Sequence, residues 1–292
     1  MVPHAIEEKI LVFFKKNISP SISFIGSYSL QGGCINEAVC FQTNYKKYFL
    51  KWNSVNRYPE MFASEAKGLT QLNETGIITV PQVIFQSNTW DHSFLLLEFI
   101  ESVERVKNFW DDFGIALACL HRVSDSHFGL DNSNYIGSLV QKNNKHDNWI
   151  DFFITERLDF QLQLALKNDN VPKKIANKFE RLYNKLHEIF PIEPPALLHG
   201  DLWNGNFMVD SKGKACIFDP AIYFGHREMD LAMSLLFGGF SPVFYESYNS
   251  VYPLEKGWKQ RMDICNLYPL LVHVNLFGGS YLSSIETILD KY

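Results

Sequence analysis

The sequence lacks the features that would place the protein in a membrane, in an export pathway or on a nucleic acid. It has no apolar run of membrane-spanning length, and its first residues, MVPHAIEEKILVFF, lack a basic segment followed by an apolar stretch and a small-residue cleavage site. The formal net charge is −5 and the basic residues are scattered, which excludes the electrostatic footprint of a nucleic-acid-binding protein. These absences predict a cytoplasmic protein with a small-molecule partner, no nucleic acid and no membrane.

Cysteine is scarce, and its arrangement argues against two kinds of covalent support. The five cysteines are odd in number and form no C-x-x-C pair, so the sequence indicates neither a disulfide framework nor a zinc site. Apolar residues, in contrast, are plentiful. A chain of 292 residues with 46% hydrophobic and 15% aromatic content can bury a large core, and its length favours two lobes.

The hydrophobic pattern changes from period two to helical spacing about a third of the way along the chain. Residues 5–17 and 59–75 have helical spacing, and five segments between and after them predict strands: SISFIGSYSL, AVCFQT, KYFLKW, TVPQVIFQ and SFLLLEFI. From about residue 107 onward, helices dominate. We predict an α+β, bilobal fold. Residues 1–100 form a β-rich lobe with a five-stranded antiparallel sheet and one main helix, and residues 101–292 form a mostly helical lobe.

One octet in the second lobe, HGDLWNGN (199–206), is unusually rich in polar residues. PPALL precedes it, and FMVDSKGKACIFDPA follows it with alternating apolar residues around a Lys212-Gly213 turn. These flanks predict short strands. The octet is therefore a loop between strands, the kind of segment that commonly carries catalytic residues.

The spacing of acidic and amide residues around this loop is that of a kinase. Asp201 and Asn206 follow the D-x-x-x-x-N pattern, and Asp219 closes the next strand, with D-P-A in place of D-F-G. Phosphoryl transfer needs a carboxylate that accepts the proton of the acceptor hydroxyl, and oxygen ligands that hold Mg²⁺ against the phosphates. We predict Asp201 as the catalytic base and Asn206 and Asp219 as the metal ligands. A polar loop with an Asx turn would explain one Asp or Asn, but not their joint occurrence with Lys51 and Glu65 in the chain order of a kinase.

Two charged residues of the first lobe fit the same pattern. Lys51 lies in the apolar strand YFLKW, and Glu65 shares a helical stripe with apolar residues, where a carboxylate is costly unless it is paired. We predict that Glu65 pairs with Lys51 and that both belong to the ATP site. Taken alone, the pair is also compatible with an edge-strand lysine and a solvated glutamate.

Two further segments of the first lobe fit the nucleotide side of a kinase site. Gly32 and Gly33, in QGGCIN, would let backbone amides approach phosphates, although the segment departs from G-x-G-x-x-G. LLLEFI matches the strand that leads into a kinase hinge, where the Glu98 carbonyl and the Ile100 amide, on either side of Phe99, would hydrogen-bond adenine. The alternative for LLLEFI is a plain buried strand followed by the start of a helix.

Together, the stretches HGDLWNGN, FDPA, YFGHREMDLAM, FGGF and VHVNLFGGSY resemble the fructosamine kinase (ketoamine kinase) family. This family belongs to the aminoglycoside phosphotransferase-like branch of the protein-kinase fold. The resemblance covers nearly the whole chain, including GGCIN and FGLDNSNYIG. The chain passes from Asp219 to GHREMDLA with no room for an activation loop, which argues against a protein-kinase type of substrate. Trp203, two residues after Asp201, separates the sequence from aminoglycoside and choline kinases.

The resemblance implies a reaction and its partners. Such enzymes use ATP and Mg²⁺ to phosphorylate the sugar O3 of ketoamines such as fructosamine or ribulosamine, and the phosphorylated adduct then falls apart and frees the amine. The expected partner is a small ketoamine or a glycated amine, including a protein lysine. One alternative is a phosphotransferase for another small hydroxyl compound, such as an aminoglycoside or amino alcohol. Another is a nucleotide-binding pseudokinase that regulates a partner, although all the kinase roles are present here.

Three side chains bear on the acceptor. We predict that Trp203 forms a wall of the acceptor site, because it lies two residues from the base and aromatic faces suit a sugar or a cationic amine. Packing in the helical lobe is its alternative. The resemblance implies that His273 and Phe277 close the acceptor pocket, whereas we favour His273 as a satisfied core histidine.

The remaining polar residues each have two interpretations. The resemblance implies that Asp230 helps to fix the catalytic loop, and a carboxylate in the first turn of a helix is also favourable by itself. His226 and Arg227 line the acceptor side or lie in solvent. We expect His199 to brace the loop through backbone hydrogen bonds. Cys34 is a redox-sensitive thiolate among backbone amides or a small unreactive residue.

Overall fold

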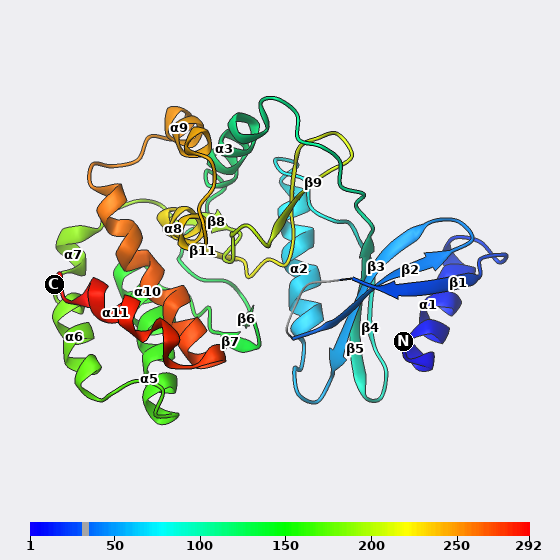
Figure 1. Cartoon of the computed structure of the whole chain (residues 1–292), viewed down its shortest axis with the longest axis horizontal. Helices are drawn as coiled ribbons and strands as arrows, with labels where there is room; N and C mark the ends of the chain where they lie inside the picture. The colour runs from blue at the N-terminus through cyan, green and yellow to red at the C-terminus, as the bar shows by residue number, and fades with distance from the viewer. Residues whose placement is uncertain (31–34) are drawn as a thin grey trace.

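The computed structural model describes residues 1–30 and 35–292 and divides them into a β-rich lobe and a helical lobe (Figure 1). Five antiparallel strands form one sheet in the order β1-β2-β3-β5-β4. Their bounds are Phe24–Ser29 (β1), Glu37–Thr43 (β2), Lys47–Ser54 (β3), Val83–Asn88 (β4) and His92–Glu98 (β5). The predicted five-stranded antiparallel sheet is confirmed, and β3 is its central strand.

A helix covers the outer face of this sheet. α1 (His4–Asn17) buries its apolar stripe, including Ile10 and Phe14, in the same cluster as Leu50 and Leu96 of the sheet. The rings of Phe14 and Tyr48 lie 4.7 Å apart at their centroids. The outer face of the sheet is therefore a core of its own, separate from the core of the helical lobe.

The inner face of the sheet turns toward the helical lobe and is covered by α2 (Met61–Glu74) (Figure 1). Phe62 and Leu69 of α2 belong to the same buried cluster as Leu95 of β5. Lys51 of β3 is the register partner of Leu95, and directly opposed residues of an antiparallel pair share one face. The ammonium of Lys51 therefore projects from the inner face, toward α2.

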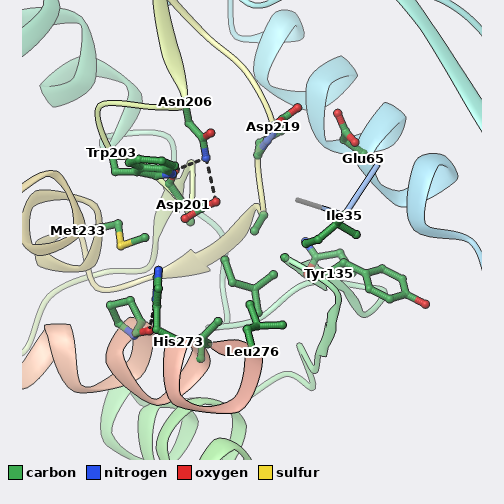
Figure 2. Close-up of a pocket in the computed structure, with 18 of the residues that line it drawn as sticks. Ile35, Glu65, Tyr135, Asp201, Trp203, Asn206, Asp219, Met233, His273 and Leu276 are labelled. Carbon is green, nitrogen blue, oxygen red and sulfur yellow. Dashed lines mark hydrogen bonds between the residues drawn. The ribbon is translucent and has the colours of Figure 1, made fainter. Parts of the chain in front are cut away.

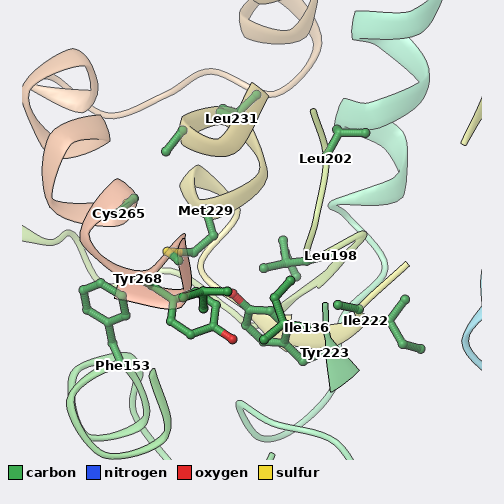
Figure 3. Close-up of a cluster of buried hydrophobic side chains, with 14 of the residues drawn as sticks. Ile136, Phe153, Leu198, Leu202, Ile222, Tyr223, Met229, Leu231, Cys265 and Tyr268 are labelled. Atoms are coloured by element: carbon green, nitrogen blue, oxygen red, sulfur yellow. The ribbon is translucent and has the colours of Figure 1, made fainter. Parts of the chain in front are cut away.

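The helical lobe is built around α10 (Trp258–Phe277), whose residues 264–272 are all buried, so this part of the helix is surrounded by the core. Figure 3 shows Cys265 and Tyr268 of α10 packed with Met229 and Tyr223. The other helices are α3 (Phe109–Leu120), α4 (Trp149–Phe152), α5 (Phe160–Lys167), α6 (Lys174–Tyr183), α7 (Leu186–Ile189), α8 (Glu228–Leu236), α9 (Pro242–Val251) and α11 (Leu282–Leu289). A short 3₁₀ turn, Gly279–Tyr281, joins α10 to α11.

Three two-stranded ladders position the loops of the helical lobe. β8 (Ala196–Leu198) pairs with β11 (Tyr223–Gly225), β9 (Phe207–Val209) pairs with β10 (Ala215–Ile217), and β6 (Asn134–Ile136) pairs with β7 (Leu139–Gln141). The octet 199–206 runs from β8 to β9, so the predicted loop between short strands is confirmed.

Two helical segments of the second lobe are interrupted. The segment 149–166 contains a π-helical stretch, Phe153–Asp159, which carries the buried Glu156 and Arg157. The run 175–189 divides into α6 and α7. Within the described ranges, the structure contains no helix that is long and apolar enough to span a membrane.

Candidate active site

A cavity of about 500 Å³ lies between the two lobes and gathers the residues that the motifs singled out (Figure 2). Lys51 and Glu65 line it from the β-rich lobe, and Asp201, Asn206 and Asp219 line it from the helical lobe. We call it the interlobe cavity.

The catalytic loop is held at its start by a carboxylate of α8. Asp230, in the first turn of α8, accepts hydrogen bonds from the backbone amides of His199 at 2.7 Å and Gly200 at 2.8 Å. Gly200 has φ +82°, and a Cβ there would lie 2.1 Å from the Ala221 carbonyl oxygen, so only glycine fits. Asp230 thus fixes the loop, as the resemblance implies.

His199 braces the loop from within, as predicted. Its Nε2 donates to the Phe218 carbonyl at 3.0 Å, and its Nδ1 accepts from the Asp201 amide at 3.3 Å. This arrangement requires the neutral ring, and burial lowers the pKa of His199 accordingly. Both ring nitrogens are engaged with the backbone, so His199 is not available as a base.

Asp201 has the environment of a general base. Asn206 donates from Nδ2 to the Asp201 carboxylate at 2.8 Å and to the Asp201 backbone carbonyl at 2.8 Å (Figure 2). Burial raises the pKa of Asp201 to about 7, against the lowering effect of the Asn206 hydrogen bond. A base whose pKa lies near the working pH transfers protons most effectively.

Lys51 and Glu65 form a buried ion pair, with 2.6 Å between Lys51 Nζ and Glu65 Oε1. Lys51 Nζ also lies 2.5 Å from Asp219 Oδ1. Burial lowers the pKa of Lys51, but the Asp219 and Glu65 carboxylates raise it by more, so the ammonium stays charged. The alternative of an edge-strand lysine and a solvated glutamate is therefore wrong, because β3 is the central strand and the Lys51 and Glu65 side chains are only 4% and 11% exposed.

Asp219 adopts a strained backbone conformation that its neighbours hold in place. Its φ of +53° lies in the left-handed region, which is unfavourable for a residue other than glycine. On one side the Phe218 amide donates to the Asn206 carbonyl at 3.0 Å, and on the other the Ala221 amide donates to the His199 carbonyl at 2.9 Å. Such strain commonly marks functional sites.

The donor set around Asp219 fits Mg²⁺ bound together with phosphates. Asp219 and Asn206 offer carboxylate and amide oxygens, and Mg²⁺ in phosphate-transfer sites is typically held by one or two carboxylates and the substrate. Among the described residues, no group of three or more His, Cys, Asp or Glu side chains is arranged to hold a metal alone. The site thus suits a metal that arrives with a nucleotide.

The far end of the interlobe cavity is aromatic. Trp203, Phe237, His273, Phe277 and Tyr281 all line it, and their rings form a chain with centroids 5.9 Å apart for Trp203–Phe237 and 4.9 Å for Phe237–His273. Trp203 also covers Gly205, where a Cβ would lie 2.4 Å from the indole. The indole therefore both packs on its own loop and faces the cavity.

His273 lies on the cavity wall and is only partly buried, so our preference for a core histidine is wrong. Its Nδ1 donates to the Pro269 carbonyl at 2.7 Å, and Figure 2 shows the ring projecting from α10 into the cavity. Burial lowers the pKa of His273, which keeps the ring neutral and leaves Nε2 as an acceptor. Phe277, at the rim, is 56% exposed.

The predicted hinge segment also lines a hollow. Glu98, Phe99 and Ile100 face it together with Tyr48 and Ser211. Gly32 and Gly33, the glycines predicted to approach phosphates, lie outside the described residues. So does Cys34, for which the sequence suggested a redox-sensitive thiolate or an unreactive residue.

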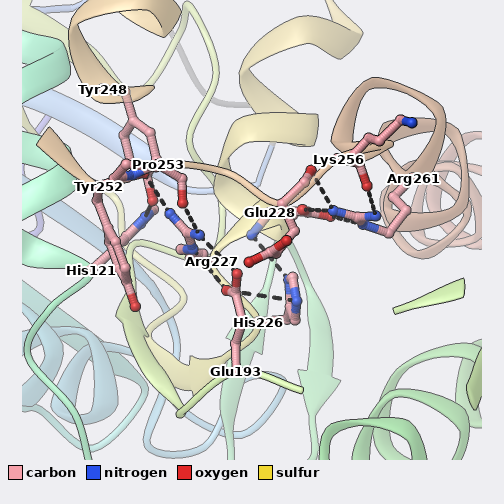
Figure 4. Close-up of polar contacts among 11 residues, drawn as sticks. His121, Glu193, His226, Arg227, Glu228, Tyr248, Tyr252, Pro253, Lys256 and Arg261 are labelled. Atoms are coloured by element: carbon pink, nitrogen blue, oxygen red, sulfur yellow. Dashed lines mark hydrogen bonds and ion pairs between the residues drawn. The ribbon is translucent and has the colours of Figure 1, made fainter. Parts of the chain in front are cut away.

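Both interpretations of His226 and Arg227 are wrong, because each side chain is buried away from the interlobe cavity. Arg227 donates through Nε and Nη2 to both carboxylate oxygens of Glu193, each at 2.7 Å, and Arg261 does the same with Glu228 at 2.8 and 2.7 Å (Figure 4). We call Glu193, Arg227, Glu228 and Arg261 the Arg227 cluster. Sequence reasoning missed it because its partners lie more than thirty positions apart with no motif between them.

A second group that sequence reasoning missed is a set of buried amides beside the cavity. Asn134 and Gln141, at the ends of the β6–β7 hairpin, hydrogen-bond to the segment that follows Asp219. Uncharged amides carry no pattern that separates them from ordinary hairpin residues. The only signal was that FGLDNSNYIG, which contains Asn134, belongs to the resemblance.

Comparisons with known proteins agree with this geometry. The family model described as fructosamine kinase matches residues 7–292. The protein-ribulosamine 3-kinase of Oryza sativa subsp. japonica is 39% identical over 272 residues, which are 91% of this chain and 78% of the rice protein.

Among solved structures, a Haemophilus somnus protein named as a fructosamine-3-kinase superposes with a TM-score of 0.88 at 30% identity, covering 97% of this chain and 96% of its own. An aminoglycoside phosphotransferase shares the fold at a TM-score of 0.62 and 13% identity, covering 97% and 96% of the two chains. The bilobal kinase-like fold is confirmed by these superpositions, and the chain belongs to the fructosamine kinase family.

Proposed function

We propose that this protein is an ATP-dependent kinase that phosphorylates the O3 sugar hydroxyl of ketoamines such as fructosamine or ribulosamine. The observation that carries the proposal is the meeting of Asp201 with the Lys51–Glu65–Asp219 cluster in one cavity that has an aromatic acceptor end. Family membership points to the same chemistry.

The residues divide the reaction among them. Lys51, oriented by Glu65, binds the ATP phosphates, and Asn206 and Asp219 hold Mg²⁺, which neutralises the phosphate charge when it is bound. Asp201 accepts the proton of the acceptor hydroxyl. The backbone of Glu98, Phe99 and Ile100 holds the adenine.

The acceptor end favours a ketoamine over an aminoglycoside. Apart from Asp201, none of the described residues that line this end carries a carboxylate, and His273 is neutral. A polycationic aminoglycoside would therefore find only the Asp201 carboxylate to pair with at this end. The face of Trp203 instead suits the apolar face of one sugar, and its π-system suits a single amine.

The biological setting follows from the product. A ketoamine phosphorylated at O3 loses its sugar and releases the amine, so the proposed role is deglycation of small amines or of protein lysines. The open rim at Phe277 is compatible with both free and protein-bound adducts.

Parallel measurement of ATP consumption with ribulosamine, fructosamine, kanamycin and choline tests the proposal. We expect turnover with at least one ketoamine, none with kanamycin or choline, and release of the free amine. Turnover with kanamycin or choline alone would contradict the proposal and indicate a phosphotransferase for an aminoglycoside or an amino alcohol. Mg·ATP binding without turnover of any acceptor would indicate a regulatory nucleotide-binding protein.

A further inference from the structure

We propose that Gln141 is a positioning residue that connects the wall of the acceptor site to the backbone around Asp219. This inference rests on the proposed function, because it takes Asp219 as a metal ligand. Gln141 ends strand β7, contributes nothing to the cavity surface and is 1% exposed. Its role is therefore indirect.

The amide of Gln141 is fully used. Nε2 donates to the Ala221 carbonyl at 2.9 Å and to Asn134 Oδ1 at 2.8 Å, and Oε1 accepts from the Tyr268 hydroxyl at 2.7 Å. Each bond is buried, so removing the amide leaves the partner groups without compensation from water. The three partners come from three separate segments: the strand β6, the segment after Asp219, and α10.

The Ala221 carbonyl has little room to move. It passes so close to Gly200 that a Cβ there would lie 2.1 Å from the oxygen, and the Ala221 amide is bound to the His199 carbonyl at 2.9 Å. One residue later, Asn134 donates from Nδ2 to the Ile222 carbonyl at 2.8 Å. The hairpin amides thus secure the backbone two and three residues after Asp219.

These hydrogen bonds to Ala221 and Ile222 matter because the nearby backbone of Asp219 is strained. A φ of +53° is unfavourable for a residue other than glycine, and such a conformation persists only where the surroundings hold it. The hydrogen bonds to Ala221 and Ile222 supply that hold from the far side of Pro220. Without them, the carboxylate of Asp219 would lose its fixed position beside Lys51.

The other end of the Gln141 connection lies at the acceptor site. Tyr268 lines the interlobe cavity, and the buried guanidinium of Arg157 lies 5.3 Å from its ring and 3.9 Å from that of Tyr223, another cavity residue. Arg157 also donates to Asn143, whose amide donates to Asn134 at 3.0 Å. The wall that an acceptor touches and the backbone that aims the metal ligand therefore share one hydrogen-bonded network.

The test compares Gln141→Met with Gln161→Met. Gln161 is a matched control, because it is equally buried and hydrogen-bonded to an asparagine, Asn275, but has no bond to the Asp219 segment. The readout is the affinity for Mn²⁺ in the presence of AMP-PNP, measured by electron paramagnetic resonance well below the melting temperature. This readout needs no acceptor and no turnover.

We expect Gln141→Met to weaken Mn²⁺ binding about tenfold, as loss of an outer-shell partner commonly does, and Gln161→Met to leave it within about twofold of wild type. In steady state, Gln141→Met should also raise the Mg²⁺ concentration needed for half-maximal rate and the ketoamine KM. Equal Mn²⁺ affinities for the two folded variants would overturn the proposal and leave Gln141 a purely structural residue.

Tyr268→Phe keeps the test decisive if Gln141→Met fails to fold. It removes only the hydroxyl that donates to Gln141 Oε1, and we expect a smaller weakening of Mn²⁺ binding, about twofold to threefold. An unchanged affinity in that variant would also count against the connection. If wild type binds Mn·AMP-PNP but phosphorylates no ketoamine, the proposed function fails while the comparison of variants still stands.

Discussion

Two groups of charged side chains in this protein, the Arg227 cluster and the charged end of the interlobe cavity, differ in the balance between positive and negative charges. In the Arg227 cluster each guanidinium meets one carboxylate through two N–H groups, and further N–H groups donate to backbone carbonyls such as those of Tyr252 and Lys256 (Figure 4). Positive and negative charges are equal in number. Such a cluster needs no ligand.

The charged end of the cavity is unbalanced. Among the described residues that line it, Lys51 is the single lysine or arginine, whereas Glu65, Asp201 and Asp219 all carry carboxylates. The Asp219 side chain is 47% exposed, but excess negative charge beside the buried Lys51–Glu65 pair is still unfavourable in the protein alone. The comparison indicates that the Arg227 cluster, whose charges cancel, stabilises the fold. The charged end of the interlobe cavity, which has excess negative charge, is adapted to bind cations and to take up a proton.

The largest expected effect comes from neutralising Asp201, the proposed catalytic base at the charged end of the interlobe cavity. Asp201→Asn should lower kcat by about 10²–10⁴-fold, because the amide cannot accept the proton of the acceptor hydroxyl. ATP binding, measured by calorimetry, should change little. Retention of more than about a tenth of the wild-type kcat would remove Asp201 from the role of base.

Breaking the balanced cluster should affect stability and leave catalysis nearly intact. Arg227→Met leaves the Glu193 carboxylate buried without its bidentate partner, which typically costs about 3–5 kcal/mol, or roughly 6–20 °C in melting temperature. Thermal melts and kinetics at 25 °C measure the two effects separately. The double variant Arg227→Met, Glu193→Leu should recover much of the loss, since no unpaired charge remains.

The opposite outcome would erase the distinction between the two clusters. A large fall in kcat for Arg227→Met, with an unchanged melting temperature, would mean that the Arg227 cluster acts in catalysis.

The aromatic end of the interlobe cavity extends the comparison to a third group of residues. We expect it to bind the acceptor through aromatic faces and not through charged side chains. Trp203→Ala should raise the ketoamine KM about tenfold, leave the ATP KM little changed and lower the melting temperature by only a few degrees. Trp258→Ala is a matched control, since Trp258 is also partly buried but lies outside the cavity. A large loss of stability with an unaltered ketoamine KM would show that Trp203 is a core residue.

The smallest expected effect is on stability as a function of pH. The pKa of Asp201 is raised from its usual 3.8 to about 7 by burial, so folding favours the protonated carboxyl. The stabilisation is complete below pH 3.8 and is lost as pH rises to about 7. Asp201→Asn does not titrate, so its melting temperature should exceed that of wild type increasingly over this range and by a constant amount above it.

We expect the difference above pH 7 to be a few degrees, about 1 kcal/mol, because the carboxylate is partly exposed to the cavity. Scanning calorimetry at pH 5, 6, 7 and 8 measures it. A wild type that is the more stable protein at pH 8 would show that the ionised carboxylate is stabilised in its site.

The sequence by itself determined the β-rich lobe, the catalytic loop and the residues that meet around it. Alternating apolar residues reveal strands because side chains alternate between two faces, and the spacing of Asp201, Asn206 and Asp219 is local to one loop and hairpin. Lys51 and Glu65 were recognisable because a charge within an apolar stripe requires a partner.

Only the tertiary structure decided which polar residues of the helical lobe face the cavity and which are buried in pairs. Arg227 and Glu193 lie 34 positions apart, and Gln141 and Ala221 lie 80 positions apart. A hydrogen bond over such a separation has no periodic signature, because the packing of whole helices and hairpins brings its two ends together. For the same reason, the hydrophobic pattern alone could not distinguish His273 from a core histidine, although the family resemblance placed it at the acceptor pocket.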